Sequence, residues 1–475
     1  MENIDFNLLS PLILLAVAPV ATLMVIAIYR NHTVTFCLAV ILLVLFLIDC
    51  FRLWSLSFDN QMVDDLLMID KFGLFFMILI AIGGILILFI SYSYLNNNVK
   101  VAEEFYVLFL TALVGAVVLV SSIHFATLFL GLEILSISLY AMIAYTREWK
   151  NSIEGGLKYL ILAAGSSAFL LFGMGLIYLQ TGALDFEAIG SSLEKVNLIS
   201  TAGLAMMLVG IGFKLGLVPF HIWTPDIYQG APAPVTALIA SVSKGSMVVV
   251  LVRFLHTTNS QQFAWIIWTF SAMAIASMLI GSLLALKQSN LKRLLAYSSI
   301  AHLGYLLVAI IAGSDFSVEA VTYYLVAYFI SIIGAFGILS IFNSTGEIEQ
   351  VSDLQGMFWT RPWLSVIFGV MFFSLVGIPL TAGFIGKFYV VMAAVNSGLW
   401  ALAITLVVSS AIGLYYYLRV IKTMLTPVAK DAPKSALGQL STMGLVVMSI
   451  LGLLVIWFGV FPSQLIAVIR SIEVL

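Results

Sequence analysis

Long apolar runs, most of them close to the roughly 20 residues that an α-helix needs to cross a bilayer, alternate with short polar stretches along nearly the whole chain. Fourteen such runs are present, and each predicts a membrane-spanning helix. They lie at 9–29, 34–54, 72–94, 105–122, 125–145, 155–179, 198–225, 234–254, 264–286, 294–313, 319–342, 362–394, 399–425 and 440–461. The pattern therefore predicts an all-α membrane protein that forms a single polytopic domain over residues 1–475.

Two of these runs are too long for one straight span. A helix over the 33 residues of 362–394 would extend about 50 Å, whereas the hydrocarbon core is about 30 Å thick. The runs 198–225 and 362–394 contain Pro219 and Pro379, and proline interrupts the helical hydrogen-bond ladder. Broken helices at corresponding places in two halves of a membrane protein point to a transport site. The alternative is an ordinary packed proline kink.

Composition supports lipid as the solvent of this chain. Of its 475 residues 62% are hydrophobic and only 9% are charged, whereas soluble domains carry about 25% charged residues. The net charge of −2 indicates no nucleic-acid partner. The two cysteines, Cys37 and Cys50, lack the spacing of a metal site or of a disulfide framework.

Ionisable residues inside the apolar runs are the strongest functional signal. Each costs about 2.5–3.5 kcal/mol or more at the centre of a bilayer, so each must face the protein interior, pair or contact water. The candidates are Glu133, Lys158, Lys214, Lys244 and Lys387. Lys158 lies near the end of its run, where a lysine can instead extend its head group to the membrane surface.

The chemistry of these residues favours proton transfer. Glu133 is the carboxylate near a span centre, and a nearby carboxylate favours the charged form of a lysine, whereas removal from water favours the neutral form. A lysine balanced between these effects can gain and lose a proton, while arginine effectively never deprotonates. The pattern fits a proton relay through Lys214, Lys244 and Lys387. A purely structural ion pair of Glu133 with one lysine is the alternative.

Two histidines are candidates of second rank, together with Lys158. His221 follows Pro219 in one broken run, and His302 lies in a polar stripe with two serines and a tyrosine. Histidine titrates near neutral pH and can pass protons. Each can also be an ordinary hydrogen-bonded core residue.

The basic residues predict the orientation of the chain. Fourteen spans place both ends on one side of the membrane, and loops that face the cytoplasm carry an excess of lysine and arginine. One set of loops carries twelve basic residues and the opposite set carries five. The twelve are Arg30, Lys100, Arg147, Lys150, Lys287, Lys292, Arg293, Arg361, Arg419, Lys422, Lys430 and Lys434, and the five are Arg52, Lys71, Lys195, Arg253 and Arg470. Both termini are therefore expected on the non-cytoplasmic side.

A long motif around the first broken run resembles a known family. GFKLGLVPFHIWTPDIYQGAPAPVT at 212–236 closely resembles the signature of the proton-conducting, antiporter-like membrane subunits. That family includes three large subunits of respiratory complex I (NADH:quinone oxidoreductase) and subunits of multi-subunit cation/proton antiporters. YQGAPAPV at 228–235 is similar to the N-type subunit of bacterial complex I. Further matches, which extend the resemblance over essentially the whole chain, are LGLE at 130–133, KRLLAYSSIAHLGY at 292–305, GIP at 377–379, GFIGKF at 383–388 and GLYYYLR at 413–419.

The resemblance implies a fold and a role for each matching residue. It implies two inverted five-helix repeats over 101–260 and 261–425, each with one broken helix, preceded by three helices in 1–100 and followed by a C-terminal helix in 426–475. Glu133 resembles a glutamate that modulates the proton-binding Lys214. Lys244 resembles a central connecting residue, and Lys387 resembles the residue through which the proton leaves.

The resemblance also implies where the remaining chemistry lies. This chain would hold no cofactor, and flavin, iron–sulfur clusters, NADH and quinone would belong to partner subunits in a bacterial inner membrane. Its partners would be lipid, protons and other membrane subunits of complex I, including neighbouring antiporter-like subunits. Two other functions stay open: a subunit of a Na⁺/H⁺ antiporter, and a structural membrane spacer whose buried charges only hold helices together.

Overall fold

A computed structural model describes residues 6–56, 61–63, 65–193, 197–313, 315–343, 349–427 and 442–472. Helices make up most of this part of the chain, and two short strands form an antiparallel pair. The elements are α1 (Phe6–Ile28), α2 (His32–Ser55), β1 (Gln61–Val63), β2 (Leu67–Ile69), α3 (Lys71–Asn98), α4 (Glu103–Ser121), α5 (Phe125–Ile143), α6 (Lys150–Thr181), α7 (Phe186–Ser192), α8 (Leu198–Leu215), α9 (Trp223–Gly230), α10 (Ala233–Leu238), η1 (Ile239–Ser243), α11 (Lys244–Thr257), η2 (Ser260–Gln262), α12 (Ala264–Leu286), α13 (Leu291–Ala312), α14 (Asp315–Asn343), η3 (Val351–Leu354), α15 (Met357–Thr360), α16 (Pro362–Val376), α17 (Ala382–Asn396), α18 (Trp400–Leu425), α19 (Thr442–Val460) and α20 (Pro462–Arg470).

These helices confirm the all-α membrane architecture. Thirteen helices in the described part of the chain are long and apolar enough to cross a membrane, with α10, η1 and α11 counted as one. The remaining apolar run is divided into the shorter helices α16 and α17. All fourteen runs predicted from the sequence are therefore helical over most of their length. The division into two inverted five-helix repeats stays a prediction.

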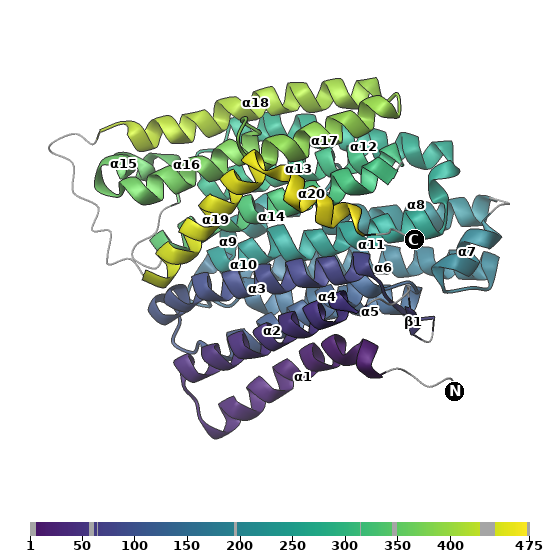
Figure 1. Ribbon diagram of the computed structural model, residues 1–475, viewed down its shortest axis with the longest axis horizontal. Helices are drawn as coiled ribbons and strands as arrows, with labels where there is room; N and C mark the ends of the chain where they lie inside the picture. The colour runs from purple at the N-terminus through teal and green to yellow at the C-terminus, as the bar shows by residue number, and fades with distance from the viewer. Residues whose placement is uncertain are drawn as a thin grey trace.

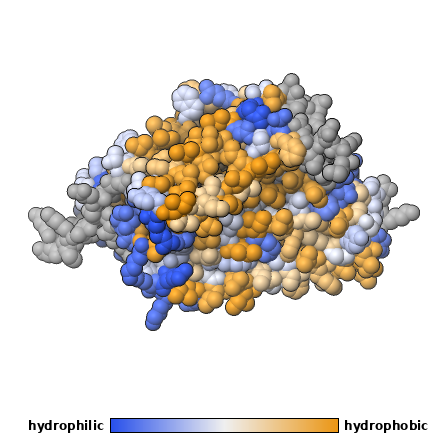
Figure 2. All heavy atoms as spheres, turned by 90° about the horizontal axis from the view of Figure 1, so that it is seen from below, coloured by the Kyte–Doolittle hydropathy of each residue, from blue (hydrophilic) through white to orange (hydrophobic). Residues whose placement is uncertain are grey.

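Most helices run side by side along the longest axis of the molecule (Figure 1). The helices α11, α13 and α14 are almost completely buried, whereas α1 and α6 leave most of their surface exposed. Figure 2 shows a broad hydrophobic surface across the middle of one face, with hydrophilic residues gathered mainly toward its edges. Such a surface suits contact with lipid or with other membrane helices.

The two predicted helix breaks are present. Helix α8 ends at Leu215 and is followed by Gly216 with φ 72°, and α16 ends at Val376 and is followed by Gly377 with φ 87°. Glycine adopts this left-handed conformation at little cost and commonly ends helices. Pro219 and Pro379 lie a few residues further on, within the interruptions, where they cannot continue the helix.

Backbone groups near the breaks find partners inside the protein. The Trp223 indole donates to the Phe213 carbonyl at 2.9 Å. The Val218 N–H donates to Ser277 Oγ at 3.0 Å. In the second break the Val376 carbonyl accepts hydrogen bonds from side chains of α17 and α18. Non-helical backbone is tolerated at membrane depth when it is satisfied in this way.

Part of the orientation prediction falls outside the structure. Lys195, Lys430 and Lys434 lie outside the described residues. Arg253, counted on the non-cytoplasmic side, lies in α11, and Lys292, counted on the cytoplasmic side, lies in α13; both are buried. The orientation of the termini stays a prediction.

Candidate functional site

Lys214 lies at the end of α8, just before the first helix break, and only 3% of it is exposed. Its ammonium donates to Ser136 Oγ of α5 at 2.8 Å and to the Tyr159 hydroxyl of α6 at 3.1 Å. The same nitrogen lies 5.5 Å from the centre of the Tyr159 ring. Hydroxyl groups, rather than a carboxylate, therefore hold this lysine.

Glu133 lies one helical turn before Ser136 on α5 and is partly buried. Its carboxylate accepts a hydrogen bond from Ser167 Oγ of α6 at 2.5 Å. Within the described residues no hydrogen bond or ion pair joins it to Lys214, whose two hydrogen bonds go to Ser136 and Tyr159. The modulation of Lys214 by Glu133 stays a prediction.

Lys244 is the first residue of α11 and directly follows the π-helical turn η1. Its ammonium donates to Ser299 Oγ of α13 at 2.8 Å, and only 1% of the residue is exposed. Two aromatic rings face the same nitrogen, with centres at 5.9 Å for Trp223 and 5.3 Å for Tyr228. Single π turns inside helices are frequent at functional sites, and the apolar pattern of this run gave no sign of one.

Aromatic side chains lie between Lys214 and Lys244. The Tyr159 ring, which contacts Lys214, lies 5.1 Å from the Trp223 ring, which contacts Lys244. Trp223 is the first residue of α9, so the helix break itself places this ring between the two lysines. Gly216 lies beside Lys244, since a Cβ on this glycine would be 3.5 Å from the ammonium.

His302 connects Lys244 to the second half of the chain. Its Nδ1 lies 2.6 Å from the Tyr324 hydroxyl of α14. Its ring lies 5.4 Å from that of Tyr328, whose hydroxyl donates to Ser299, the partner of Lys244. The polar stripe that the sequence predicted on this helix is therefore present and entirely buried.

Lys387 lies on α17, after the second helix break, and is 8% exposed. Its ammonium donates to the Val376 carbonyl at 2.7 Å and to Ser410 Oγ of α18 at 2.9 Å. It also lies 4.9 Å from the centre of the Tyr305 ring, one turn along α13 from His302. A carbonyl released by the break thus holds the third lysine.

We refer to Glu133, Lys214, Lys244, His302 and Lys387 as the buried row. Its members come from α5, α8, α11, α13 and α17, and hydroxyl or aromatic side chains separate successive members. The contacts described for the three lysines are with neutral groups. Because no carboxylate is fixed against them, each lysine can gain or lose a proton without breaking a direct ion pair.

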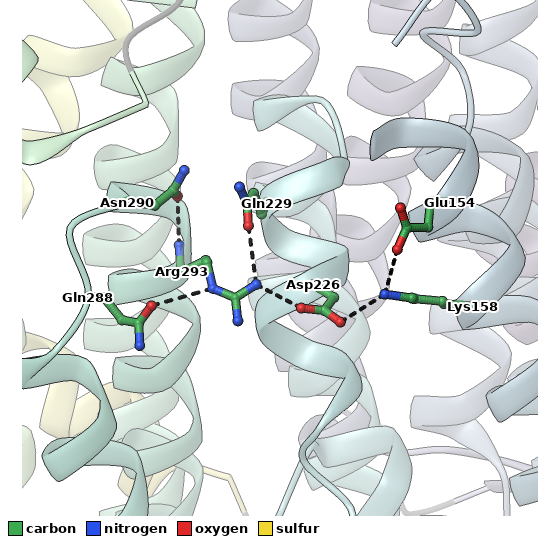
Figure 3. Close-up of polar contacts among 7 residues, drawn as sticks. All are labelled: Glu154, Lys158, Asp226, Gln229, Gln288, Asn290 and Arg293. Atoms are coloured by element: carbon green, nitrogen blue, oxygen red, sulfur yellow. Dashed lines mark hydrogen bonds and ion pairs between the residues drawn. The ribbon is translucent and has the colours of Figure 1, made fainter. Parts of the chain in front are cut away.

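Lys158 lies outside the buried row. Figure 3 shows it in a network with Glu154 of the same helix and Asp226 of α9, at 2.6 and 3.1 Å. Asp226 also binds Arg293 of α13 at 2.7 Å. The Lys158 side chain is 44% exposed, so this network joins helix ends near the surface. Neither its exposure nor its partners resemble those of the three buried lysines.

His221 also lies apart from the row, in the segment between α8 and α9. It is half-buried, and its Nδ1 has no hydrogen-bond partner among the described atoms. No hydrogen bond or ring contact joins it to a lysine of the row within the described residues.

The sequence did not reveal a fully buried ion pair between Arg253 of α11 and Asp70 before α3. Arg253 Nη1 and Nη2 bind the two Asp70 carboxylate oxygens at 2.9 and 2.8 Å, and both side chains are 0% exposed. The two residues are 183 positions apart in the sequence, so no local sequence pattern predicts the pair. A search of the described residues finds no group of three or more His, Cys, Asp or Glu arranged to hold a metal ion.

Comparison with known proteins gives consistent matches. The family model "NADH:quinone oxidoreductase/Mrp antiporter, TM" matches residues 122–413, which include the whole buried row. NADH-quinone oxidoreductase subunit N of Ectopseudomonas mendocina is 42% identical, over 98% of this chain and 95% of that protein. NADH-quinone oxidoreductase subunit N of Nitrosospira multiformis is 45% identical, over 99% and 96%.

Solved structures show the same fold. A chain of respiratory complex I from Thermus thermophilus, solved with bound aureothin, is 28% identical with a TM-score of 0.83, covering 96% of this chain and 98% of that one. A chain of the Mrp complex from Dietzia sp. DQ12-45-1b has a TM-score of 0.88 at 17% identity, covering 98% and 97%. The second match shows the fold alone.

Proposed function

The chain belongs to the NADH-quinone oxidoreductase subunit N family, and we propose that it carries protons across the membrane while partner subunits pass electrons from NADH to quinone. It is a multi-pass membrane protein of the inner membrane, and we place both termini on the non-cytoplasmic side. Flavin, iron–sulfur clusters, NADH and quinone are assigned to the partner subunits. Its neighbours in the membrane are further antiporter-like subunits.

The observation that carries this proposal is the set of neutral partners around the three buried lysines. The same chain contains a contrasting arrangement, in which Arg253 is held by both oxygens of Asp70. Arginine stays protonated in any surroundings, and bidentate pairing with a carboxylate suits such a permanent charge. Lys214, Lys244 and Lys387 are as deeply buried but bind hydroxyls and a carbonyl. Such lysines can exchange protons, whereas a buried charge with only a structural role is expected to be paired with an opposite charge that offsets the cost of its burial.

The route we propose follows the buried row. A proton held by Lys214, whose charge responds to Glu133, moves to Lys244 and then by way of Ser299, Tyr328 and His302 toward Lys387. Hydroxyl groups line the second half of this route, whereas Tyr159 and Trp223 lie between the first two lysines. Transfer from Lys214 to Lys244 therefore needs water to enter beside these rings. We assign the control of the route to this step.

The test compares Lys214→Met with Lys158→Met in the otherwise intact complex. Methionine keeps the apolar volume of the lysine stem and removes the proton site. We expect the Lys214 variant to assemble but to lose NADH:quinone turnover and the pH gradient, because a positioned proton-transfer group contributes about 10²–10⁴-fold. The Lys158 variant should retain most of both, since Lys158 lies outside the row.

Other outcomes would overturn the proposal. Normal turnover and normal pumping by the Lys214 variant would exclude the relay. Loss of assembly, confirmed with Lys244→Met and Lys387→Met, would favour a structural spacer instead. A gradient that depends on added Na⁺ in wild-type membranes would favour a Na⁺/H⁺ antiporter.

A further inference from the structure

A cavity of about 640 Å³ opens beside the first turns of α14, away from the Lys158 network. Its walls come from the end of α11, the end of α13, the start of α14 and the short helix α20. Its wall is mixed: apolar side chains such as Val252, Ile310 and Phe316 alternate with polar ones, namely His256, Gln261, Ser317, Glu319, Thr322 and Arg470. Water takes about 30 Å³ per molecule in the liquid, so a space of this size has room for several water molecules beside the polar groups.

The position of the cavity places it on one face of the membrane. The Lys158 network binds Arg293 in the first turn of α13, whereas the cavity is lined by Ile310 near the end of the same helix. The 22 residues of α13 extend about 33 Å, which is the thickness of the hydrocarbon core. The network and the cavity therefore lie at opposite membrane faces. The cavity face is also the one that we assign to the non-cytoplasmic side.

Helix α14 leads from this cavity to the buried row. Glu319 and Thr322 line the cavity, and only 1% of Thr322 is exposed. Tyr324, whose hydroxyl binds His302, follows Glu319 by five residues, about 7.5 Å along the helix axis and about 140° around it, so a proton passing between them needs an intervening water. The inner end of the cavity therefore approaches the row within about two helical turns.

Helix α17 reaches the same place from Lys387. A Cβ on Gly386 would lie 3.0 Å from Tyr324, so α14 and α17 pack closely next to this lysine. Tyr389 stacks on Tyr323 at 5.6 Å and also interacts with Glu319. Glu319, on α14, thus lies beside α17, the helix on which the row ends.

The Glu319 carboxylate is held at the edge of the cavity by one exposed cation. Its side chain is 12% exposed, and both carboxylate oxygens lie 3.2 Å from Arg470 Nε. Arg470 is 64% exposed on α20, and ion pairs with such exposed partners are weak. The other ionisable groups around Glu319 are Tyr389 and, across the cavity, His256. Protonation of Glu319 would release Arg470 to water, in contrast to the Asp70 carboxylate that Arg253 holds out of solvent.

We propose that this cavity is the proton outlet of the chain and that Glu319 is its release-side acceptor. The inference rests on the proposed proton transport. A proton leaving the row at Lys387, or passed from His302 to Tyr324, is taken up by the Glu319 carboxylate, which becomes neutral and releases Arg470. The proton then passes to water in the cavity, and the restored carboxylate pairs with Arg470 again.

The first experiment replaces Glu319 in the intact complex and measures assembly, NADH:quinone turnover and the pH gradient. Glu319→Gln is expected to lower turnover and gradient by at least about tenfold, below the full contribution of a positioned proton-transfer group because cavity water can partly substitute. Glu319→Asp keeps the carboxylate and should recover most of the loss. The matched control is Glu187→Gln, an exposed carboxylate on α7 that does not line the cavity.

Arg470→Gln separates the proton-accepting role from a structural one. This variant removes the same ion pair but keeps the Glu319 carboxylate, so its loss should be much smaller than that of Glu319→Gln. Equal losses in the two variants would identify the ion pair as the important feature and would overturn the inference. So would normal pumping by Glu319→Gln.

The second experiment blocks the cavity in the assembled complex and decides the matter if Glu319→Gln fails to assemble. Val318→Cys, which lines the cavity, is made in a Cys37→Ser background because Cys37 is exposed. A charged thiol reagent that does not cross membranes is applied from either side. Inhibition from the non-cytoplasmic side alone, absent with the exposed control Leu184→Cys, is expected. Labelling without inhibition would overturn the outlet but leave the proposed function intact, whereas normal pumping by Lys214→Met would overturn that function itself.

Discussion

The buried pair of Asp70 and Arg253 gives the sharpest quantitative prediction. Asp70→Asn removes the carboxylate charge but keeps an oxygen that can still accept the hydrogen bond from the Gly73 N–H at the start of α3. Arg253→Met removes the guanidinium and keeps an apolar stem. Each single change therefore leaves one unpaired charge in a place that is 0% exposed.

The expected size follows from the cost of an uncompensated buried charge. Breaking such a pair by removing one partner costs about 3–5 kcal/mol, whereas replacing both partners is often near neutral. Without Asp70, the described contacts left to the guanidinium are Met68 Sδ at 3.0 Å and the Phe72 ring at 5.5 Å, neither of which carries a negative charge. We expect the double variant to recover most of the loss seen in either single variant, so the two substitutions should be strongly non-additive.

The assay is the amount of assembled complex in the membrane, followed by its resistance to heat. A loss of 1–2 kcal/mol can already change abundance several-fold, so both single variants should accumulate poorly and the double variant should accumulate well. Turnover per assembled complex should stay close to wild type, because the pair lies outside the buried row. The reasoning fails if the double variant is no better than the poorer single variant, or if the singles accumulate normally.

Two further changes test the site itself. Ser299→Ala removes the hydroxyl that accepts hydrogen bonds from Lys244 and from Tyr328. The bond from the charged Lys244 is worth about 1.5–3 kcal/mol, so turnover should fall by about tenfold or more without loss of assembly. Ser298→Ala on the same helix is the control. Gly216→Ala places a Cβ at φ 72°, 2.6 Å from Thr224 Oγ1. We expect it to reduce the free energy of unfolding by at least about 1 kcal/mol, measured as lower resistance of the complex to heat. Gly165→Ala, whose Cβ would meet nothing within 4 Å, should have no such effect.

The membrane spans and the breaks in them could be predicted from the sequence because they depend on local properties. An apolar run of sufficient length excludes alternatives to a helix in lipid. Gly216 and Gly377 end α8 and α16 in the left-handed conformation, and Pro219 and Pro379 follow where the helix cannot continue, whereas Pro11 and Pro19 lie within α1 without breaking it. The burial of Lys214, Lys244 and Lys387 followed from their place deep in apolar runs, since an unpaired lysine in contact with lipid is too costly.

The partners of these residues depend on contacts between distant parts of the chain, which local patterns do not contain. Lys158 and Lys214 both lie in apolar runs, but folding brings Asp226 to Lys158 and brings Ser136 and Tyr159 to Lys214. The interaction of Glu133 with Ser167, the π turn before Lys244 and the cavity beside Glu319 likewise arise from packing.

Sequence alone thus determined which residues enter the membrane and where its helices break, because hydropathy and proline chemistry act over a few neighbouring residues. Only the tertiary structure decided which partner each buried charge meets. Arg253 meets a carboxylate 183 residues away, whereas the described partners of Lys244 are the Ser299 hydroxyl and aromatic rings. That difference is set by which helices pack together, and it separates the structural charges of this protein from its candidate proton carriers.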